Sequence, residues 1–513
     1  MGKNRKNRGN RRRDHSTPLS KHRNVGRTLV PPLNTLPGVT RHTRWLDERM
    51  PEVLWACLVR AVLPRDQALG VFRDVAVIAR EFIDSPMHLN ALIPTHTNLA
   101  QRHPALIPRI VQLIAAKPLG YAALRPLLLL DSLPGREYWV AAIAAEPGPQ
   151  EFDLLADSVL EFFDHQSEHS TDVRWLLVIF GILTRKVRFP TTMAQRVDEI
   201  ANYPNQGDLR SVRPSIRSKE QMMWIEVGNE SPAYEWSAAF WHECHAKTPC
   251  ILAVPEEVAP PTPVSDDVGP IVFNAMNALS DHWIATSRTT AVDAAHEGAF
   301  AFVLYALACL VEILKGNRRR IAGRLLLRTL TECRITFAYL LAKNDPELWL
   351  KFRRYGAGQA KLVLLKVKEA AIPPHSISIE KLEQLANEDV WQEFVDINLG
   401  SWAGIDLRRM ADESGTKQLY DAHYGWNSGF AHSHWSAMRD ATLSNCLNPL
   451  HRGHRIPLSG ERKLGDVLPD ALEIGETMIA ELLRAYPGRT VTLQKPQQAD
   501  ANSLPQASPD EAV

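Results

Sequence analysis

The sequence predicts a mainly α-helical protein: a helical N-terminal domain, a proline-rich linker and a C-terminal helical bundle. Three observations support this fold class. From Trp45 onward, apolar residues recur at helical spacing in one segment after another. Proline or glycine separates many of these segments, as expected where helices end. The chain has 513 residues, 45% of them apolar. A chain of this length is too long for one ordinary core, so more than one domain is predicted.

Residues 1–44 are predicted to be a disordered basic tail and lead-in. Within them, residues 1–27 carry ten Lys or Arg and one acid, whereas the whole chain has a formal charge of only +1. This composition cannot bury a core. It is also not a secretory signal, because no apolar run follows the charges. Residues 1–27 are therefore a candidate arm for RNA or another nucleic acid, and equally a solvated tail.

Residues 45–254 are predicted to form the N-terminal helical domain. Short helices with punctuated turns suit a solenoid, but no repeat consensus aligns, so an irregular helical domain is equally allowed. In either form, such a surface is a candidate site for a protein partner. The expected helices are 53–63, 66–82, 104–116, 120–130, 136–145, 149–163 and 171–187.

The end of this domain, EWSAAFWHECHAKTPCIL (235–252), contains four zinc-capable side chains. They are His242, Cys244, His245 and Cys250, and their spacing matches no standard zinc motif. On a helix, His242 and His245 share a face while Cys244 points elsewhere. We therefore predict packing through the neighbouring aromatic residues and no metal site.

Residues 255–270 are predicted to be the linker, because four prolines between 255 and 263 exclude a helix and favour an extended spacer. Residues 271–486 follow as the C-terminal bundle, and residues 487–513 are predicted to be a disordered tail. The longest uncharged apolar run, Gly298–Val311, is shorter than the ~20 residues that cross a bilayer, so no membrane segment is expected. The expected helices of the bundle are 271–286, 289–315, 318–343, 346–371 (broken or bent at Gly356 and Gly358) and 466–485.

Two polar ladders within the bundle are the candidate functional residues. Residues four apart on a helix lie nearly above one another, so each ladder forms one stripe. If the stripes face each other, Arg328 can hold an anion and Glu332 can orient it. The first ladder is Arg324, Arg328 and Glu332; the second is Tyr420, Tyr424, Ser428 and His432, with Asn427 in the adjacent row.

The six cysteines are scattered without a CxxC pair, which is typical of reduced thiols in a cytoplasmic protein. The sequence contains no P-loop, HExxH, GxSxG or GxGxxG motif, so no cofactor is predicted.

Three stretches carry a resemblance to a known family: RTLTECRITFAYL (328–340), FRRYGAGQAK (352–361) and YDAHYGWNSGFAH (420–432). Through them, residues 290–440 resemble a bacterial family of helical domains of unknown function, number fifty-six seventy-seven. The resemblance implies a helical bundle and supplies no activity.

A weaker resemblance is to the HEPN superfamily, many of whose members are metal-independent RNases. Their signature places an Arg about five residues before a His. Asn427 and His432 have that spacing here, but Asn stands in the place of the Arg. Arg328 or Arg324 would have to stabilise the phosphate from another helix.

Three functions follow from these observations. The first is a bacterial cytosolic binding or effector protein with a polar site between helices, linked to nucleic acid. The second is a HEPN-like endoribonuclease with His432 as general acid or base and Ser428 beside it. The third is a non-catalytic helical interaction scaffold. Whether the protein is an enzyme stays open at this point.

Overall fold

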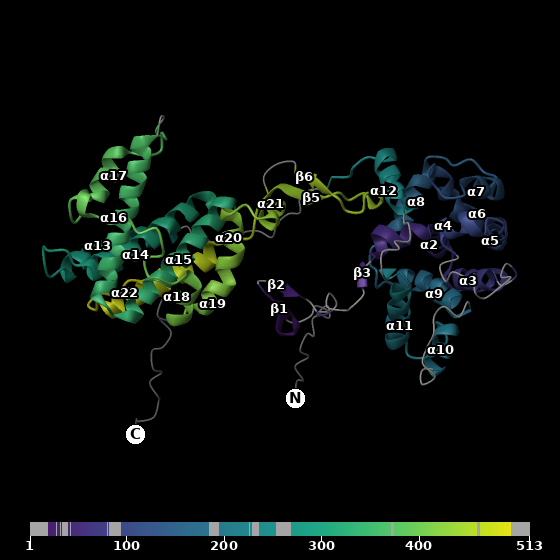
Figure 1. Cartoon of the computed structure of the whole chain (residues 1–513), viewed down its shortest axis with the longest axis horizontal. Helices are drawn as coiled ribbons and strands as arrows, with labels where there is room; N and C mark the ends of the chain where they lie inside the picture. The colour runs from purple at the N-terminus through teal and green to yellow at the C-terminus, as the bar shows by residue number, and fades with distance from the viewer. Residues whose placement is uncertain are drawn as a thin grey trace, which may run out of the picture. The chain divides into compact units, whose positions relative to one another are not determined.

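The computed structural model describes residues 43–79, 94–183, 194–224, 235–252, 268–370, 374–458 and 462–493. It also describes shorter pieces at 19–26, 28–30, 32, 39–41, 81 and 226–227. Most of the basic segment 1–27, most of the predicted linker 255–270 and residues 494–513 lie outside these ranges. Helices account for nearly all the regular structure of the described residues, which confirms the predicted fold class (Figure 1).

The chain forms two compact units. The first unit is Met1–Ala253 together with Asn445–Arg455, and the second is Val254–Ser444 together with Ile456–Val513. The range 271–486 predicted for the C-terminal bundle includes 445–455, but this segment packs with the N-terminal residues. The first unit is therefore built from two parts of the chain that are far apart in sequence.

The first unit is organised around α2. Every residue from Leu54 to Arg60 is buried, because the segment LWACLVR is apolar nearly all round. Helices α3, α6, α8 and α9 pack against α2, and α11 packs against α9. The helices of this unit are η1 (Leu19–Lys21), η3 (Trp45–Arg49), α1 (Met50–Glu52), α2 (Leu54–Val62), α3 (Arg65–Ala79), α4 (His96–Arg102), α5 (Leu106–Ala115), α6 (Gly120–Leu124), η6 (Arg125–Leu129), α7 (Arg136–Ile143), α8 (Gln150–Leu160), α9 (Glu168–Leu183), α10 (Ala194–Ala201), α11 (Leu209–Met223), α12 (Glu235–Lys247) and η11 (Pro449–His451).

Two short antiparallel strand pairs accompany these helices. In the first, Arg23 pairs with Val30 and Val25 with Thr28; in the second, Val39 pairs with Val227. The strands are β1 (Arg23–Val25), β2 (Thr28–Val30), β3 (Val39–Arg41) and β4 (Glu226–Val227).

Buried ion pairs join α2, α9 and α11 at the centre of the first unit. The Arg60 Nε lies 2.8 Å from a carboxylate oxygen of the fully buried Asp172. The Tyr203 hydroxyl donates to the same carboxylate at 2.6 Å. From α9, the buried Arg174 pairs with the fully buried Glu220 of α11 at 3.4 Å. These paired charges cross-link three helices, and removing one partner would leave an uncompensated buried charge.

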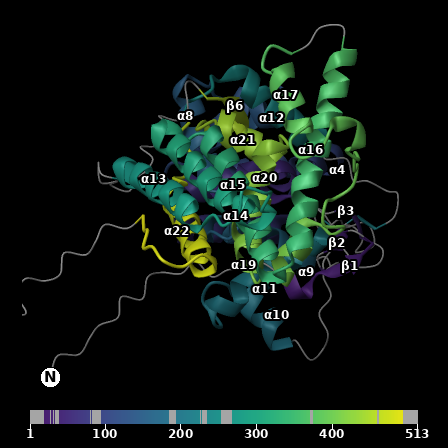
Figure 2. The same ribbon diagram turned by 90° about the vertical axis from the view of Figure 1, so that its left-hand side faces the viewer.

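The second unit is organised around α14, which packs against α13, α15, α16 and α22 (Figure 2). Apolar residues cover all sides of its middle, yet Ala301, Tyr305 and Ala308 are exposed in one stripe. Two of these side chains are small and the third carries a hydroxyl, so solvent contact costs little. The helices of this unit are α13 (Val268–Thr286), α14 (Ala294–Glu312), η8 (Ile313–Asn317), α15 (Ile321–Lys343), α16 (Pro346–Glu369), α17 (Ile379–Ala386), η9 (Gln392–Phe394), α18 (Leu407–Glu413), α19 (Lys417–Leu419), η10 (Tyr420–Tyr424), α20 (Gly425–Ala431), α21 (Trp435–Thr442) and α22 (Leu468–Ala485).

A short strand pair, β5 (Leu443–Asn445) with β6 (Arg455–Pro457), lies where the chain enters and leaves the segment 445–455. By length and composition only, Ala294–Asn317 could cross a membrane, with a mean hydropathy of 1.9. Core helices pass the same test, and 44% of this stretch is buried within the structure.

Helix α16 corrects a second expectation. It runs without interruption from Pro346 to Glu369, although we expected a break or bend at Gly356 and Gly358. A Cβ atom at Gly358 would lie 2.5 Å from the carbonyl oxygen of Asp396. Glycine at this position therefore allows a neighbouring segment to approach the helix closely.

Candidate functional site

Helix α15 carries the first polar ladder, and the chain from Tyr420 to Ala431 packs directly against it. Residues 420–424 form a single π-helical turn, η10, and α20 continues from it without a gap. Such π turns occur frequently at functional sites, because the extra residue changes which side chains face the neighbouring helix. Here the turn presents Tyr424 to Arg328.

Arg328, Glu332 and Tyr424 are brought together at the centre of this contact. The Arg328 guanidinium lies 2.9 Å from a Glu332 carboxylate oxygen and 3.5 Å from the Tyr424 hydroxyl. Its Cζ atom also lies over the Tyr424 ring, 5.4 Å from the centroid. About a fifth of the Arg328 side chain and a third of the Glu332 side chain are exposed, so a ligand can reach both.

A stack of two tyrosine rings extends the cluster. Tyr420 and Tyr424 lie with centroids 4.8 Å apart and an angle of 19° between their planes. The Lys417 ammonium lies 5.4 Å from the Tyr420 centroid, so a cation stands at each end of the stack. Burial, and then the neighbouring Tyr424, raise the pKa of Tyr420. The Tyr420 phenol therefore stays protonated at neutral pH and can donate a hydrogen bond.

Arg324 lies one turn before Arg328 on α15 and is half-buried. Burial lowers the pKa of its guanidinium, and attraction from Asp440 and Asp470 offsets part of this effect. The Nε atoms of Arg324 and Arg328 are both buried and have no hydrogen-bond partner among the described residues. Two buried N–H donors on successive turns of one helix are a place where an acceptor oxygen would be strongly favoured.

The other predicted residues of α20 divide into a buried and an exposed group. Asn427 and Ser428 are buried, and the Asn427 amide donates to the His423 carbonyl at 2.7 Å. His432 ends α20 as an exposed residue, with its ring 6.1 Å from that of His434. Within the described part of the chain, no hydrogen bond or ion pair joins His432 to Arg324, Arg328 or Glu332. The structure thus groups three of the predicted residues and places His432 outside them.

Sequence reasoning missed the flanking residues of this site. Lys417 precedes Tyr420 by three positions, a spacing that could have indicated a shared helix face. Asp440 and Asp470 carry no such signal, because they come from elements distant in sequence from Arg324. The π turn at Tyr420–Tyr424 was not predicted either.

The zinc-capable side chains of the first unit are also regrouped by the fold. His245 and Cys250 come together with His451 and His454, while Cys244 is buried in the core and His242 is exposed elsewhere on α12. All six cysteines are free thiols, five of them buried and Cys250 exposed.

The fold and the site define a mainly helical protein with a polar cluster between two helical segments of its second unit. Residues 304–445 match a family of unknown function (DUF5677), which confirms the resemblance seen in the C-terminal half. The match covers a little over a quarter of the chain and contains the whole polar cluster. No curated protein and no solved structure matches the chain.

Proposed function

We propose that the protein is a binding protein whose second unit holds a phosphate-bearing ligand, a nucleotide or RNA, at Arg328 and Tyr424. The observation that carries this proposal is the partly exposed Arg328 guanidinium, which lies 3.5 Å from the Tyr424 hydroxyl and over the Tyr424 ring. Arginine is the residue best suited to phosphate, because its planar fork donates several hydrogen bonds at once. The Tyr424 hydroxyl adds a neutral donor to the same place.

Glu332 has a defined role in this proposal. Its carboxylate neutralises Arg328 at 2.9 Å, so a bound phosphate has to compete with it for the guanidinium. The pair therefore holds Arg328 in position and also weakens the binding of an anion. A cationic ligand would instead be attracted by Glu332, so the charge of the ligand can be tested by changing this residue.

Fluorescence anisotropy with a labelled single-stranded RNA, competed by ATP, tests the proposal. Loss of the Arg328 side chain in Arg328→Ala is expected to weaken binding about ten- to a hundredfold, from hydrogen bonds to a charged group worth about 1.5–3 kcal/mol. Glu332→Gln is expected to tighten binding, because it removes the competing carboxylate. Arg354→Ala, an exposed arginine on α16, is the matched control and is expected to bind like the wild type.

Competition by ATP shows that a free nucleotide suffices, whereas binding of RNA alone points to a polynucleotide. Equal binding by the wild type and Arg328→Ala would overturn the proposal. Repeating the titration without residues 1–18 separates any contribution of the basic tail, which we propose as an additional RNA contact. Tail binding should fall steeply with salt.

The endoribonuclease alternative lacks comparable support, since His432 is exposed and the Asn427 amide is engaged by a backbone carbonyl. The same samples examine it directly, because a nuclease would shorten the labelled RNA on a gel.

A further inference from the structure

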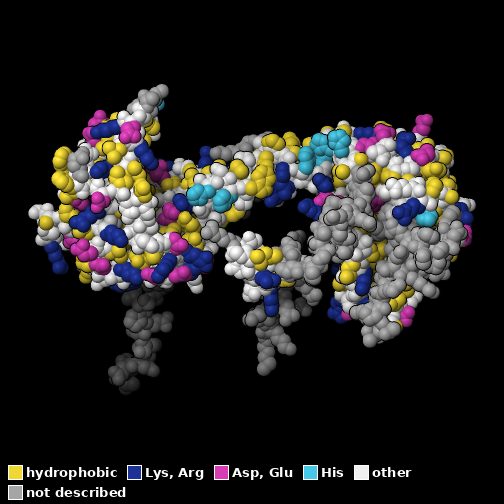
Figure 3. Space-filling view, viewed as in Figure 1, with side chains coloured by type: hydrophobic (Ala, Val, Ile, Leu, Met, Phe, Trp, Pro, Cys, Tyr) yellow, Lys and Arg dark blue, Asp and Glu magenta, His cyan; other side chains and the backbone are white. Residues whose placement is uncertain are grey.

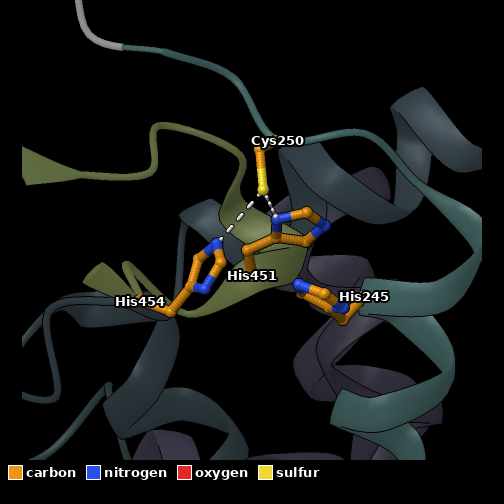
Figure 4. Close-up of side chains that lie close together, drawn as sticks. All are labelled: His245, Cys250, His451 and His454. Carbon is orange, nitrogen blue, oxygen red and sulfur yellow. Dashed lines mark hydrogen bonds between the residues drawn. The ribbon is translucent and has the colours of Figure 1, made fainter. Parts of the chain in front are cut away.

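Four metal-binding side chains meet in the first unit. His245, Cys250, His451 and His454 each point one donor atom toward a common centre, and these atoms all lie within 4.8 Å of one another (Figure 4). Histidine side chains also gather on the surface over α12 in Figure 3. His245 lies in the last turn of α12, Cys250 lies three residues after that helix, and the other two donors come from the segment 445–455. The group therefore exists only when these distant parts of the chain are together.

The distances from Cys250 to two of the histidines fit a tetrahedral metal ion. The Cys250 Sγ lies 3.5 Å from the His451 Nδ1 and 3.3 Å from the His454 Nε2. Zinc bonds of about 2.3 Å to sulfur and about 2.0 Å to nitrogen at the tetrahedral angle place those two atoms about 3.5 Å apart. The His245 ring lies 4.8 Å from the His451 ring and 5.2 Å from the His454 ring, centroid to centroid. It completes the fourth corner with a small side-chain movement.

The surroundings of His451 support the same assignment. Its Nε2 lies 3.1 Å from the Thr248 carbonyl oxygen, to which a protonated Nε2 donates. That hydrogen bond leaves the lone pair on Nδ1, the atom that faces Cys250. Metal-binding histidines usually donate their other ring N–H to a backbone carbonyl in this way, which fixes both the tautomer and the ring orientation. Asn448 holds the Thr248 loop in place by donating to the Pro249 carbonyl at 2.8 Å.

A fifth candidate donor, Cys446, lies beside this group. Its sulfur is 3.4 Å from the same His451 Nδ1, but it is buried and accepts a hydrogen bond from the Ile251 N–H at 3.4 Å. The exposed thiol of Cys250 contacts two imidazoles, whereas that of Cys446 contacts one. Cys250 is therefore the better placed thiolate, and Cys446 serves as the comparison in the experiment.

We propose that His245, Cys250, His451 and His454 bind a zinc ion that ties the segment 445–455 to the end of α12. Zinc is the ion that prefers tetrahedral sites of nitrogen and sulfur ligands. All four corners are filled by protein, so the site is structural. On binding, the Cys250 thiol gives up its proton to solvent, and the thiolate and three neutral imidazoles donate their electron pairs to the metal.

Cobalt titration of the full chain, stripped of metal with a chelator and kept in a non-thiol reductant, tests the proposal. Tetrahedral Co²⁺ with one thiolate ligand gives intense visible bands and a sulfur-to-cobalt charge-transfer band. We expect both bands to saturate at one Co²⁺ per chain and to disappear when Zn²⁺ is added. Elemental analysis of the purified protein is expected to give about one zinc per chain.

Ligand variants assign the donors. Cys250→Ser is expected to lose the charge-transfer band. His245→Ala and His454→Ala are each expected to lower the affinity for zinc at least tenfold, measured in competition with a chromophoric chelator. His242→Ala, an exposed histidine on the same helix, is the matched control and is expected to leave the affinity unchanged. Because His245 and Cys250 are exposed, these variants should keep their helical circular dichroism.

Three results would overturn the proposal: no cobalt bands in the wild type, equal weakening by His242→Ala and His245→Ala, or loss of the charge-transfer band in Cys446→Ser but not in Cys250→Ser.

Discussion

Glu52 and His96 are neighbouring buried residues of the first unit whose ionisation opposes folding. The Thr97 hydroxyl and N–H donate to the Glu52 carboxyl, but burial dominates and raises its pKa from 4.5 to about 7. His96 accepts a hydrogen bond from the Trp55 N–H through Nε2, and burial lowers its pKa from 6.5 to about 3. Both side chains are therefore neutral in the folded protein at mildly acidic pH.

The two groups have opposite effects on stability. Above pH 4.5 the unfolded chain releases the Glu52 proton, whereas the folded protein keeps it until about pH 7. The Glu52 contribution to the free energy of unfolding is thus full below pH 4.5 and is lost as pH rises to about 7. His96 has the opposite effect. Below pH 6.5 the unfolded chain takes up a proton on this histidine, whereas the folded protein keeps it neutral down to about pH 3, so stability is lost as pH falls between these values.

Glu52→Gln should remove the first effect and keep the second. Because the amide cannot ionise, the variant should gain about 2 kcal/mol of unfolding free energy relative to the wild type between pH 5 and pH 8. Urea unfolding of the first unit at both pH values measures this gain. The wild type carries the same His96 term at each pH, so it serves as the internal control. A difference between the two proteins that does not change with pH would contradict the assignment.

At the residue scale, the sequence predicted local pairs better than distant ones. The four-residue spacing of Arg328 and Glu332 places them together on any helix, and the structure pairs them. The meeting of Arg328 with Tyr424 needed two helical segments to pack in one register, which spacing alone does not fix. His245 and Cys250 stood out as metal-binding types, but their partners His451 and His454 lie about 200 positions later, and no local pattern connects them.

At the element scale, the two glycines of α16 have different environments on the same helix. A Cβ atom at Gly358 would lie 2.5 Å from the Asp396 carbonyl oxygen, whereas nothing lies within 4 Å of a Cβ atom at Gly356. Gly356 is exposed and Gly358 is buried. The two positions therefore form a matched pair for the same substitution.

Gly356→Ala should stabilise the second unit by about 0.5–1 kcal/mol, because alanine loses less backbone entropy in a helix. Gly358→Ala gains the same propensity but forces the Asp396 backbone away, and such overpacking costs about 1–3 kcal/mol. Urea unfolding of the full chain is expected to show shifts of opposite sign. Stabilisation by both variants would mean that the segment around Asp396 does not pack tightly on α16.

Most helices could be predicted from periodicity and from the residues that end them. Asp345 caps α16 by accepting from the Glu347 N–H, with Pro346 in the first turn. The short helices α17 and α18 were missed, because seven or eight residues in a polar stretch carry little periodic signal. The π turns were missed because they depend on tertiary packing and not on residue preference.

At the scale of the whole molecule, sequence reasoning could not find that the chain returns to the first unit at residues 445–455. Leu450 is buried in the core of the first unit. The Leu447 N–H donates to the Ile251 carbonyl at 2.9 Å, and Arg452 pairs with Asp47 at 3.2 Å. A boundary inferred from prolines marks one crossing between units and gives no sign of two further crossings near residues 445 and 455.

The two fragments should therefore stay associated after the linker is cut. With a protease site placed between residues 258 and 264, the two fragments are expected to co-elute after cleavage, because residues 445–455 remain packed in the first unit. Leu450→Asp puts a charge into that core and should release the fragments after cleavage. Leu447→Asp is the matched control, since Leu447 is 57% exposed and tolerates a charge.

Size-exclusion chromatography of the cleaved proteins distinguishes the outcomes. If the wild-type fragments separate on cleavage, Leu450 does not anchor the segment. The same conclusion follows if the fragments of both aspartate variants separate to the same extent.

The return of the chain to the first unit also determines when that unit can finish folding during synthesis. The first unit lacks its final piece until Arg455 has left the ribosome, although its main part ends at Ala253. At roughly 5–20 residues per second, translating the residues from Ala253 to Asn445 takes about 10–40 seconds. During that time the core residues that Leu450 packs against stay exposed to solvent. The nascent N-terminal unit thus has an incomplete core over that interval. A message truncated anywhere before the codon for Asn445 yields an N-terminal unit that cannot be completed.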